Sequence, residues 1–263
     1  MHSAPDALGV FDSGLGGLSV LHAIRQRLPA ESLLYVADSA YAPYGDQSEA
    51  FIIERSLAIG DFLLTQGVKA LVIACNTATA YAAEIMRAQL AVQVIAIEPG
   101  VKPAVQVTRN GVIGVLVTQR TARSPRLQRL IAQHASGKQV LVQACPGLVE
   151  YVEAGDFTSP ALQARLQHYI QPLLAQGADT LVLGCTHYPF LKPILQTLLP
   201  KHVHIVETSA AVAQQLERML QQHHLLATPS TVGQVAFYSS QNTPDHRRSL
   251  NQLWGEAVSV TDF

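Results

Sequence analysis

Two cysteines of this 263-residue chain end two nearly identical segments. Residues 63–75 read Leu-Leu-Thr-Gln-Gly-Val-Lys-Ala-Leu-Val-Ile-Ala-Cys, and residues 173–185 read Leu-Leu-Ala-Gln-Gly-Ala-Asp-Thr-Leu-Val-Leu-Gly-Cys, so seven of the thirteen positions are identical. A duplicated unit that places one thiol at the same point of each half, here Cys75 and Cys185, suggests two thiols that face a common centre. Such a pair is suited to take a proton from one face of a carbon and to deliver one to the opposite face.

Neither thiol is a strong base without help from its surroundings. A free thiol has a pKa near ~8.5, so only a few per cent of it is ionised at pH 7. The start of a helix contributes about 0.3–1 kcal/mol, which is less than one pKa unit. His187, two residues beyond Cys185, is the nearest group in the sequence that could assist. The alternative is that both cysteines are buried core residues, and Cys145, which has no matching copy, is expected to pack in this way.

A glycine-rich turn at residues 12–17, Asp-Ser-Gly-Leu-Gly-Gly, follows the first apolar segment and opens a helix. It lacks the Gly-Lys-Ser/Thr ending of a phosphate loop and the Gly-x-Gly-x-x-Gly spacing of a dinucleotide site. The turn lets a ligand approach the backbone, and the acidic Asp12 at its mouth suits an ammonium group better than a phosphate. The alternative is a helix N-cap followed by flexible glycines.

A second polar segment begins where the next apolar segment ends, at Asp38. In the loop 39–48 that follows, Pro43, Tyr44 and Gly45 indicate an ordered structure that covers a site. By itself, Glu153 indicates only an acid at the C-terminal end of a helix. The sequence shows no convincing metal-ligand cluster, and none of its five lysines marks a Schiff-base site for pyridoxal phosphate.

Composition indicates a core-rich globular protein, with 48% hydrophobic and 14% charged residues. A net charge of −1 leaves no basic footprint for nucleic acid or an anionic membrane, and no apolar run approaches the ~20 residues of a membrane span. Three cysteines, an odd number, argue against a disulfide framework and for a reducing compartment. We therefore expect a cytoplasmic protein.

Short apolar, β-branched segments alternate with helical patterns along the chain, which predicts an α/β protein with parallel sheets. The expected strands are residues 7–11, 33–37, 70–74, 94–97, 112–117, 140–144, 180–183, 204–206 and 235–238. Their continuous apolar character is typical of strands that are covered on both faces. Helical patterns include residues 78–89, 161–175 and 210–222.

The duplication also predicts how the chain is divided. A second pair of matching segments, residues 9–13 and 114–118, places an opening strand in each half. Proline and glycine at residues 98–103 indicate a crossover, and a second crossover near residues 206–209 would return the chain to the first half. We expect two similar lobes, each a parallel-sheet α/β sandwich: residues 1–98 with 208–263, and residues 99–207. The active site is expected in the cleft between them, at the carboxyl ends of both sheets.

Four motifs, in order along the chain, resemble the glutamate racemases within the aspartate/glutamate racemase family. They are Gly9-Val-Phe-Asp-Ser-Gly-Leu-Gly-Gly-Leu-Ser-Val20, Ala42-Pro-Tyr-Gly45, Ile73-Ala-Cys-Asn-Thr-Ala78 and Leu183-Gly-Cys-Thr-His-Tyr-Pro189. The resemblance extends over nearly the whole chain. It implies a two-lobed fold and an isomerase that works without a cofactor.

By position, the resemblance also implies which residues form the site. Its catalytic positions are Cys75 and Cys185, with Asp12, His187, Asp38 and Glu153 in support. Its substrate-binding positions are Asp12, Ser13, Pro43, Tyr44, Gly45, Asn76, Thr77, Thr118, Thr121, Thr186 and His187. The chain departs from the family where a tyrosine usual after residue 121 is absent and where Glu207 replaces the more common Asp.

The implied reaction is a two-base racemisation of glutamate. Cys185, as thiolate, takes the α-proton of L-glutamate, and Cys75, as thiol, protonates the opposite face; the resemblance alone assigns each thiol to one enantiomer. The two cysteines hold one proton between them, because two thiolates beside an anionic substrate would repel it and each other. The product, D-glutamate, points by analogy to peptidoglycan precursors of the cell wall. The expected partner is the small-molecule substrate, with a homodimer as a possible assembly.

Several other functions compete with this one. Aspartate racemase, or another amino-acid racemase of the same group, is the nearest, and inversion of L-Asp rather than L-Glu would distinguish it. An amino-acid-binding module without catalysis leaves the twin thiols unexplained and predicts binding that survives thiol alkylation. A cysteine hydrolase needs only one of the thiols, and a redox role lacks a Cys-x-x-Cys motif.

Overall fold

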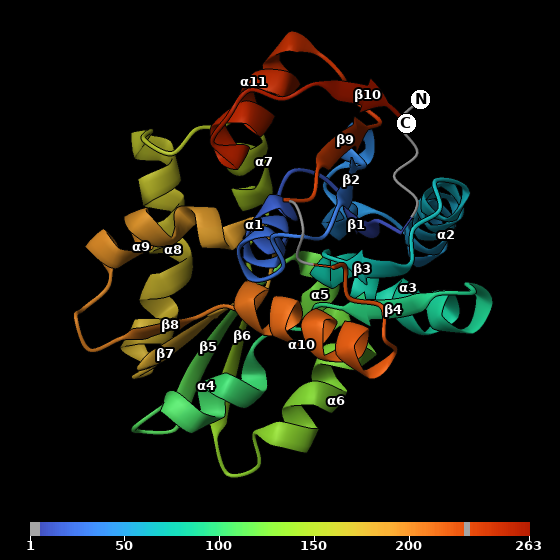
Figure 1. The fold of residues 1–263 in the computed structure, drawn as a ribbon. Coiled ribbons are helices and arrows are strands. Elements are labelled where there is room, and N and C mark those ends of the chain that lie inside the picture. Colours follow the sequence, from blue (N-terminus) through green and yellow to red (C-terminus); the bar gives the residue numbers. More distant parts are fainter. Residues whose placement is uncertain (1–5, 229–231) are drawn as a thin grey trace.

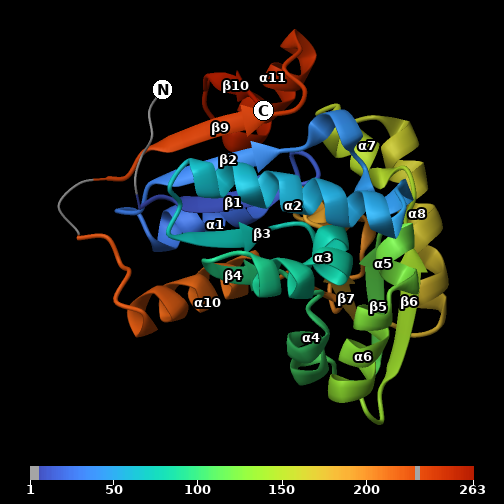
Figure 2. The same cartoon turned by 90° about the vertical axis from the view of Figure 1, so that its right-hand side faces the viewer.

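The computed structural model describes residues 6–228 and 232–263, which form two lobes, each built on a parallel β-sheet flanked by helices (Figure 1). In the view turned by 90°, the two sheets lie beside each other, and strand ends of both sheets face the region between the lobes (Figure 2). The predicted α/β class and two-lobed architecture are therefore confirmed. The lobe boundaries at residues 98 and 208 stay a prediction, and residues 1–5 and 229–231 of the predicted first lobe lie outside the described residues.

The larger sheet has six strands in the order β10-β9-β2-β1-β3-β4. They are β1 (Leu8–Asp12), β2 (Leu33–Ala37), β3 (Ala70–Ile73), β4 (Gln93–Ala96), β9 (Val235–Ser239) and β10 (Val260–Asp262). The smaller sheet has the order β6-β5-β7-β8, formed by β5 (Val112–Val117), β6 (Gln139–Ala144), β7 (Thr180–Leu183) and β8 (His204–Val206). Every pairing in both sheets is parallel. The order β2-β1-β3-β4 recurs as β6-β5-β7-β8, as expected of a duplicated unit.

Helices connect the strands and cover the sheets. They are α1 (Leu18–Arg27), α2 (Glu49–Thr65), α3 (Asn76–Gln89), α4 (Val101–Val107), α5 (Gln119–Arg123), α6 (Pro125–His134), α7 (Leu148–Glu153), α8 (Pro160–Ala175), α9 (Lys192–Leu198), α10 (Ser209–Gln222) and α11 (Pro244–Trp254). Three 3-10 turns lie between them, η1 (Ser39–Tyr41), η2 (Tyr44–Asp46) and η3 (Tyr188–Leu191). Serine or threonine side chains cap α2, α6, α8 and α11, each worth about 1 kcal/mol. No helix formed by the described residues combines the length and apolar character needed to cross a bilayer.

The nine strands expected from the sequence are all present, with ends within one residue of the expected ones. The three expected helices are α3, α8 and α10. The sequence did not predict β10, because this strand has three residues and two of them, Thr261 and Asp262, are polar and exposed. It extends the edge of the larger sheet beside β9.

Burial explains why the central strands are apolar throughout. Every residue of β1, β3 and β7 is buried. Because parallel strands end at the same edge of a sheet, the residues that follow β1 and β3 lie together, as do those that follow β5 and β7. The fold thus gathers Asp12 and Cys75 on one side of the gap between the lobes, and Thr118 and Cys185 on the other.

Two glycines at equivalent positions of β1 and β5 give a test of how tightly each lobe is packed. A Cβ on Gly114 would lie 2.6 Å from Leu181 Cδ2 and 2.9 Å from Leu173 Cδ1, whereas one on Gly9 would lie 3.1 Å from Leu63 Cδ1. We expect Gly114→Ala to lower the free energy of unfolding by about 1–3 kcal/mol through overpacking, and Gly9→Ala to lower it by less. Urea unfolding measures both, and a Gly114→Ala variant as stable as wild type would contradict this account of the packing.

Candidate active site

The two thiols lie at equivalent points of the two lobes, just past β3 and β7. Both are buried, with 4% of Cys75 and 5% of Cys185 exposed, and neither forms a disulfide. Cys75 is the residue before α3, and its Sγ accepts a hydrogen bond from the Ala78 N–H at 3.3 Å. Cys185 instead precedes Thr186 and His187, which lead into the short turn η3. The two thiols therefore lie at equivalent positions but have different local environments.

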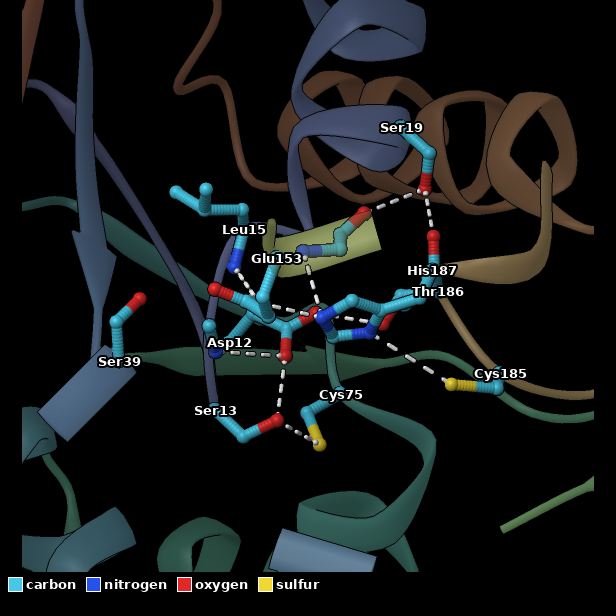
Figure 3. A network of polar contacts seen from close by, with 12 residues as sticks. Asp12, Ser13, Leu15, Ser19, Ser39, Cys75, Glu153, Cys185, Thr186 and His187 are labelled. Carbon is cyan, nitrogen blue, oxygen red and sulfur yellow. Dashed lines mark hydrogen bonds and ion pairs between the residues drawn. The ribbon is translucent and has the colours of Figure 1, made fainter. Parts of the chain in front are cut away.

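A chain of hydrogen bonds through Asp12 links the two lobes at the thiols (Figure 3). The Cys75 thiol lies 3.5 Å from Ser13 Oγ, and the Ser13 hydroxyl donates to Asp12 Oδ1 at 2.8 Å. On the other side, the Thr186 hydroxyl donates to Asp12 Oδ2 at 2.6 Å. Asp12 is fully buried, as a carboxylate can be when both of its oxygens are hydrogen-bonded. Thr186, the residue next to Cys185, is thus linked to Cys75 through the Asp12 carboxylate and Ser13.

A second chain of contacts runs from Cys185 through His187 to Glu153 (Figure 3). His187 Nδ1 lies 3.7 Å from Cys185 Sγ, and His187 Nε2 lies 2.6 Å from Glu153 Oε1. The same Glu153 oxygen accepts a hydrogen bond from the Leu15 N–H at 2.6 Å, which ties α7 to the glycine-rich turn. Gly16 packs directly against the His187 ring, with its N–H 3.2 Å from Nε2. The ring is therefore held between a thiol and a carboxylate.

The electrostatics of the two thiols differ because their neighbours carry opposite charges. Burial alone would lower the pKa of His187, but its hydrogen bonds with Cys185 and Glu153 outweigh burial and hold that pKa well above the ordinary value. Burial, together with the negative charge of Asp12, raises the pKa of Cys75 to about 12. A negative charge on Cys185 raises the pKa of Cys75 further, so one thiolate disfavours the other. Burial also raises the pKa of Asp12 itself.

Three threonine hydroxyls meet beside this network. Thr77 Oγ1, from the start of α3, lies 3.0 Å from Thr118 Oγ1 and 3.3 Å from Thr121 Oγ1, and the Thr118 hydroxyl donates to Thr121 Oγ1 at 3.0 Å. The predicted loop residue Gly45 packs on this group, since a Cβ there would lie 2.9 Å from Thr118 Cβ. Asn76 is buried beside Cys75, and neither its Oδ1 nor its Nδ2 has a hydrogen-bond partner.

The structure places Asp38 in a different group of contacts. Asp38 is fully buried, and its carboxylate accepts hydrogen bonds from Arg55 Nε at 2.9 Å, from Arg55 Nη2 at 2.7 Å and from the Tyr44 hydroxyl at 2.5 Å. Sequence reasoning missed Arg55, because nothing in the pattern of α2 distinguishes this arginine from a surface residue. The catalytic role of Asp38 stays a prediction.

A cavity of about 770 Å³ lies beside the network, between η1, α7 and α11. Pro43 and Glu153 are among its lining residues, whereas the two thiols are not. Glu153, whose side chain is 19% exposed, is therefore the member of the thiol network that meets this cavity. The thiols themselves are buried and do not line the cavity.

Two further residues that the sequence singled out lie outside the network. Cys145 is buried as a packing residue, with its Sγ 3.4 Å from the carbonyl oxygen of Gln143. Glu207 accepts a hydrogen bond from the Ser209 N–H at 2.7 Å and so stabilises the start of α10. Across residues 6–228 and 232–263, no three His, Cys, Asp or Glu side chains come together in a way that could hold a metal ion.

The chain is similar in sequence to known racemases. The family model of Asp/Glu/hydantoin racemases matches residues 8–216. A curated glutamate racemase of Pseudomonas aeruginosa (strain UCBPP-PA14) is 54% identical over 258 residues, which cover 97% of this chain and 96% of the relative.

Solved structures show the same similarity. Glutamate racemase from Francisella tularensis subsp. tularensis SCHU S4, in complex with D-glutamate, superposes with a TM-score of 0.86 at 28% identity and covers 98% of this chain and 97% of its own. Escherichia coli glutamate racemase, in complex with L-glutamate and the activator UDP-MurNAc-Ala, superposes with a TM-score of 0.85 at 31% identity over 98% of both chains.

The charge of Asp12 gives a test of the electrostatics around Cys75. We expect Asp12→Asn to lower the pKa of Cys75 from about 12, because the substitution removes a negative charge that opposes the thiolate. The pKa should stay above that of a free thiol, because burial is the larger cause and remains. The pH dependence of alkylation by iodoacetamide, with Cys145 and Cys185 replaced by serine, isolates Cys75. The exposed Asp245→Asn serves as a control, and a Cys75 pKa that rises in Asp12→Asn would contradict the assignment.

Proposed function

The chain belongs to the Asp/Glu/hydantoin racemase family, and we propose that it interconverts L- and D-glutamate by passing the α-proton between Cys185 and Cys75. The family resemblance predicted from the four motifs is thereby confirmed. The observation that carries the proposal is the position of the two buried thiols at equivalent strand ends, joined across the lobes through Ser13, Asp12 and Thr186. Two related racemases have been solved with opposite enantiomers of glutamate bound, which supports this substrate.

The surroundings of the thiols support different resting states for them. Hydrogen bonds with Cys185 and Glu153 outweigh burial and hold the pKa of His187 well above its ordinary value, so a cationic ring lies 3.7 Å from Cys185 Sγ. A cysteine acts as a base in its thiolate form. Cys75, with a pKa of about 12, stays a thiol and can donate its proton. Cys185 would then take the α-proton of L-glutamate while Cys75 protonates the opposite face, and the roles reverse for D-glutamate. The assignment of each thiol to one enantiomer follows the family resemblance.

Polar groups beside the thiols are suited to hold the substrate. An unpartnered buried amide such as that of Asn76 is unfavourable by about 1–3 kcal/mol, so a ligand that binds it recovers this free energy. We assign Asn76, the backbone N–H of Thr77 and Thr186 to the α-carboxylate, where negative charge builds up as the α-carbon loses its proton. Asp12 faces the ammonium group and keeps it protonated, which makes the α-proton more acidic.

We assign the substrate's second carboxylate to the three hydroxyls of Thr77, Thr118 and Thr121, which come from both lobes. Thr118 and Thr121 belong to the second sheet's side of the gap and Thr77 to the first, so a carboxylate at this point binds only when the lobes are closed. The adjoining residues Tyr44 and Gly45 cover the same point. Because aspartate is one methylene shorter, it would reach these hydroxyls less well, and we favour glutamate over the aspartate alternative on this ground.

The wider role follows from the product. D-glutamate made in the cytoplasm would supply the synthesis of peptidoglycan precursors for the cell wall. A homodimer remains part of this proposal, and gel filtration with light scattering tests it. Circular dichroism at a fixed wavelength, with L-glutamate and L-aspartate in parallel and no added cofactor, tests the substrate; inversion of aspartate alone would overturn the choice of glutamate.

The two-base mechanism predicts distinct outcomes for the two thiols. Cys75→Ala and Cys185→Ala should each lose racemisation, because each removes the group on one face. In D2O, Cys75→Ala should still exchange the α-proton of L-glutamate without inverting it, since Cys185 retains its access to that face. Proton NMR follows exchange, and circular dichroism follows inversion. Either single variant with wild-type racemisation would rule out the two-thiol mechanism, and binding of glutamate by an inactive wild type would favour the binding-module alternative.

The contact between Gly16 and His187 predicts how catalysis depends on the imidazole. A Cβ on Gly16 would lie 2.2 Å from His187 Nδ1, so Gly16→Ala must displace the ring from Cys185. We expect kcat to fall about a hundredfold, the lower end of general acid-base effects of about 10²–10⁴-fold. Gly9→Ala, whose new methyl meets only apolar side chains, is the control. A Gly16→Ala enzyme with wild-type kcat and an intact fold would exclude the proposed role of His187.

A further inference from the structure

Asp38 is held by a two-point ion pair with Arg55. Arg55 donates to both carboxylate oxygens, at 2.9 and 2.7 Å, and the Tyr44 hydroxyl donates to Oδ2 at 2.5 Å. Pairing of this kind fixes the orientation of both partners as well as their distance. The carboxylate therefore determines where the Tyr44 side chain lies.

Arg55 is itself fixed from two other directions. Its guanidinium lies 4.3 Å from the centre of the Tyr41 ring and 5.6 Å from that of Phe263, the last residue of the chain. Cations over aromatic faces at these distances are attracted to the ring. Because α2 carries Arg55 and the loop carries Tyr41, this arginine attaches the loop 39–48 to a long helix of the first lobe.

The same contacts continue to the proposed substrate site. Tyr44 is buried and is followed by Gly45, which packs on Thr118 of the second lobe. Thr118 bonds in turn to Thr77, two residues beyond Cys75. Burial raises the pKa of Tyr44, and so do the charge and the hydrogen bond of Asp38, with a smaller contribution from a thiolate at Cys75.

We propose that Arg55, acting through Asp38, positions the Tyr44-Gly45 segment over the substrate, and that Asp38 takes no part in proton transfer. This inference rests on the proposed racemase function and assigns a different role to Asp38 from the catalytic one expected from the family. Both oxygens of Asp38 already accept hydrogen bonds, and protonation of either would disrupt the ion pair. A carboxylate in this arrangement is suited to hold neighbours in place and poorly suited to carry protons.

The test compares Asp38→Asn, Tyr44→Phe, Arg55→Lys and Arg55→Met in the full-length protein. Positioning predicts that Asp38→Asn, Tyr44→Phe and Arg55→Met raise KM for glutamate roughly tenfold while kcat stays within about threefold. The pH dependence of kcat should be unchanged, because no titrating catalytic group is removed. Arg55→Lys should recover part of the loss, since an ammonium keeps the charge without the two-point geometry. The double variant Asp38→Asn with Arg55→Met should resemble each single variant.

The matched control is another buried ion pair of the first lobe, Lys69 with Glu31, whose atoms lie 2.7 Å apart away from the site. Glu31→Gln should lower the melting temperature and leave KM unchanged, which separates loss of stability from loss of positioning. If Arg55→Met fails to fold, Tyr44→Phe decides alone, because it leaves the ion pair intact.

Two results would overturn the inference while the racemase function stands. One is a kcat for Asp38→Asn that falls a hundredfold or more, with an altered pH profile and an unchanged KM, as removal of an acid or base would give. The other is a wild-type KM in both Tyr44→Phe and Arg55→Met. A wild-type protein that does not invert glutamate would overturn the proposed function and this inference together.

Discussion

The buried carboxylate of Asp12 is the constraint on which the geometry of the site depends. A charge with no solvent exposure must have its oxygens satisfied by the protein, and here one oxygen bonds Ser13 of its own lobe and the other bonds Thr186 of the opposite lobe. Hydrogen bonds to a charged group contribute about 1.5–3 kcal/mol each. Thr186 follows Cys185 directly, and Ser13 contacts Cys75, so satisfying this one carboxylate also fixes the separation of the two thiols.

Duplication supplies a symmetric frame, and the residues after each thiol break that symmetry. The recurring strand order places Cys75 and Cys185 at equivalent points. After Cys75 a regular helix begins, and burial together with the charge of Asp12 raises the pKa of this thiol. After Cys185 the chain turns so that His187 reaches back to the sulfur, with Glu153 supporting the ring from behind. The proposed two-base racemisation needs one base and one acid at any moment, and this arrangement would supply them from two cysteine side chains.

Prediction from the sequence succeeded where a strong periodic pattern set the structure. Continuous apolar segments predicted where the central strands lie. Residues at the ends of these segments predicted the positions of the two thiols and of Asp12. The sequence patterns did not predict contacts that depend on the path of a loop. Arg55 meets Asp38 only because the loop 39–48 folds back over α2, and no local pattern records this. Likewise Glu153 suggested only a helix end, since its contact with His187 joins residues 34 positions apart in separate elements.

Because both thiols are buried, access to them depends on the contacts that hold the two lobes together. At the periphery, Arg126 pairs with Glu84 at 2.9 Å across the lobes, but Glu84 is 71% exposed, and such pairs contribute about 0–1 kcal/mol. The strong bonds between the lobes lie at the centre, where Thr186 donates to Asp12. In the proposed binding mode, the substrate ammonium would supply a donor at Asp12, and the substrate carboxylates would bind hydroxyls from both lobes. Closure of the lobes would then be most favourable with the substrate in place, which would keep water from the carbon that loses its proton.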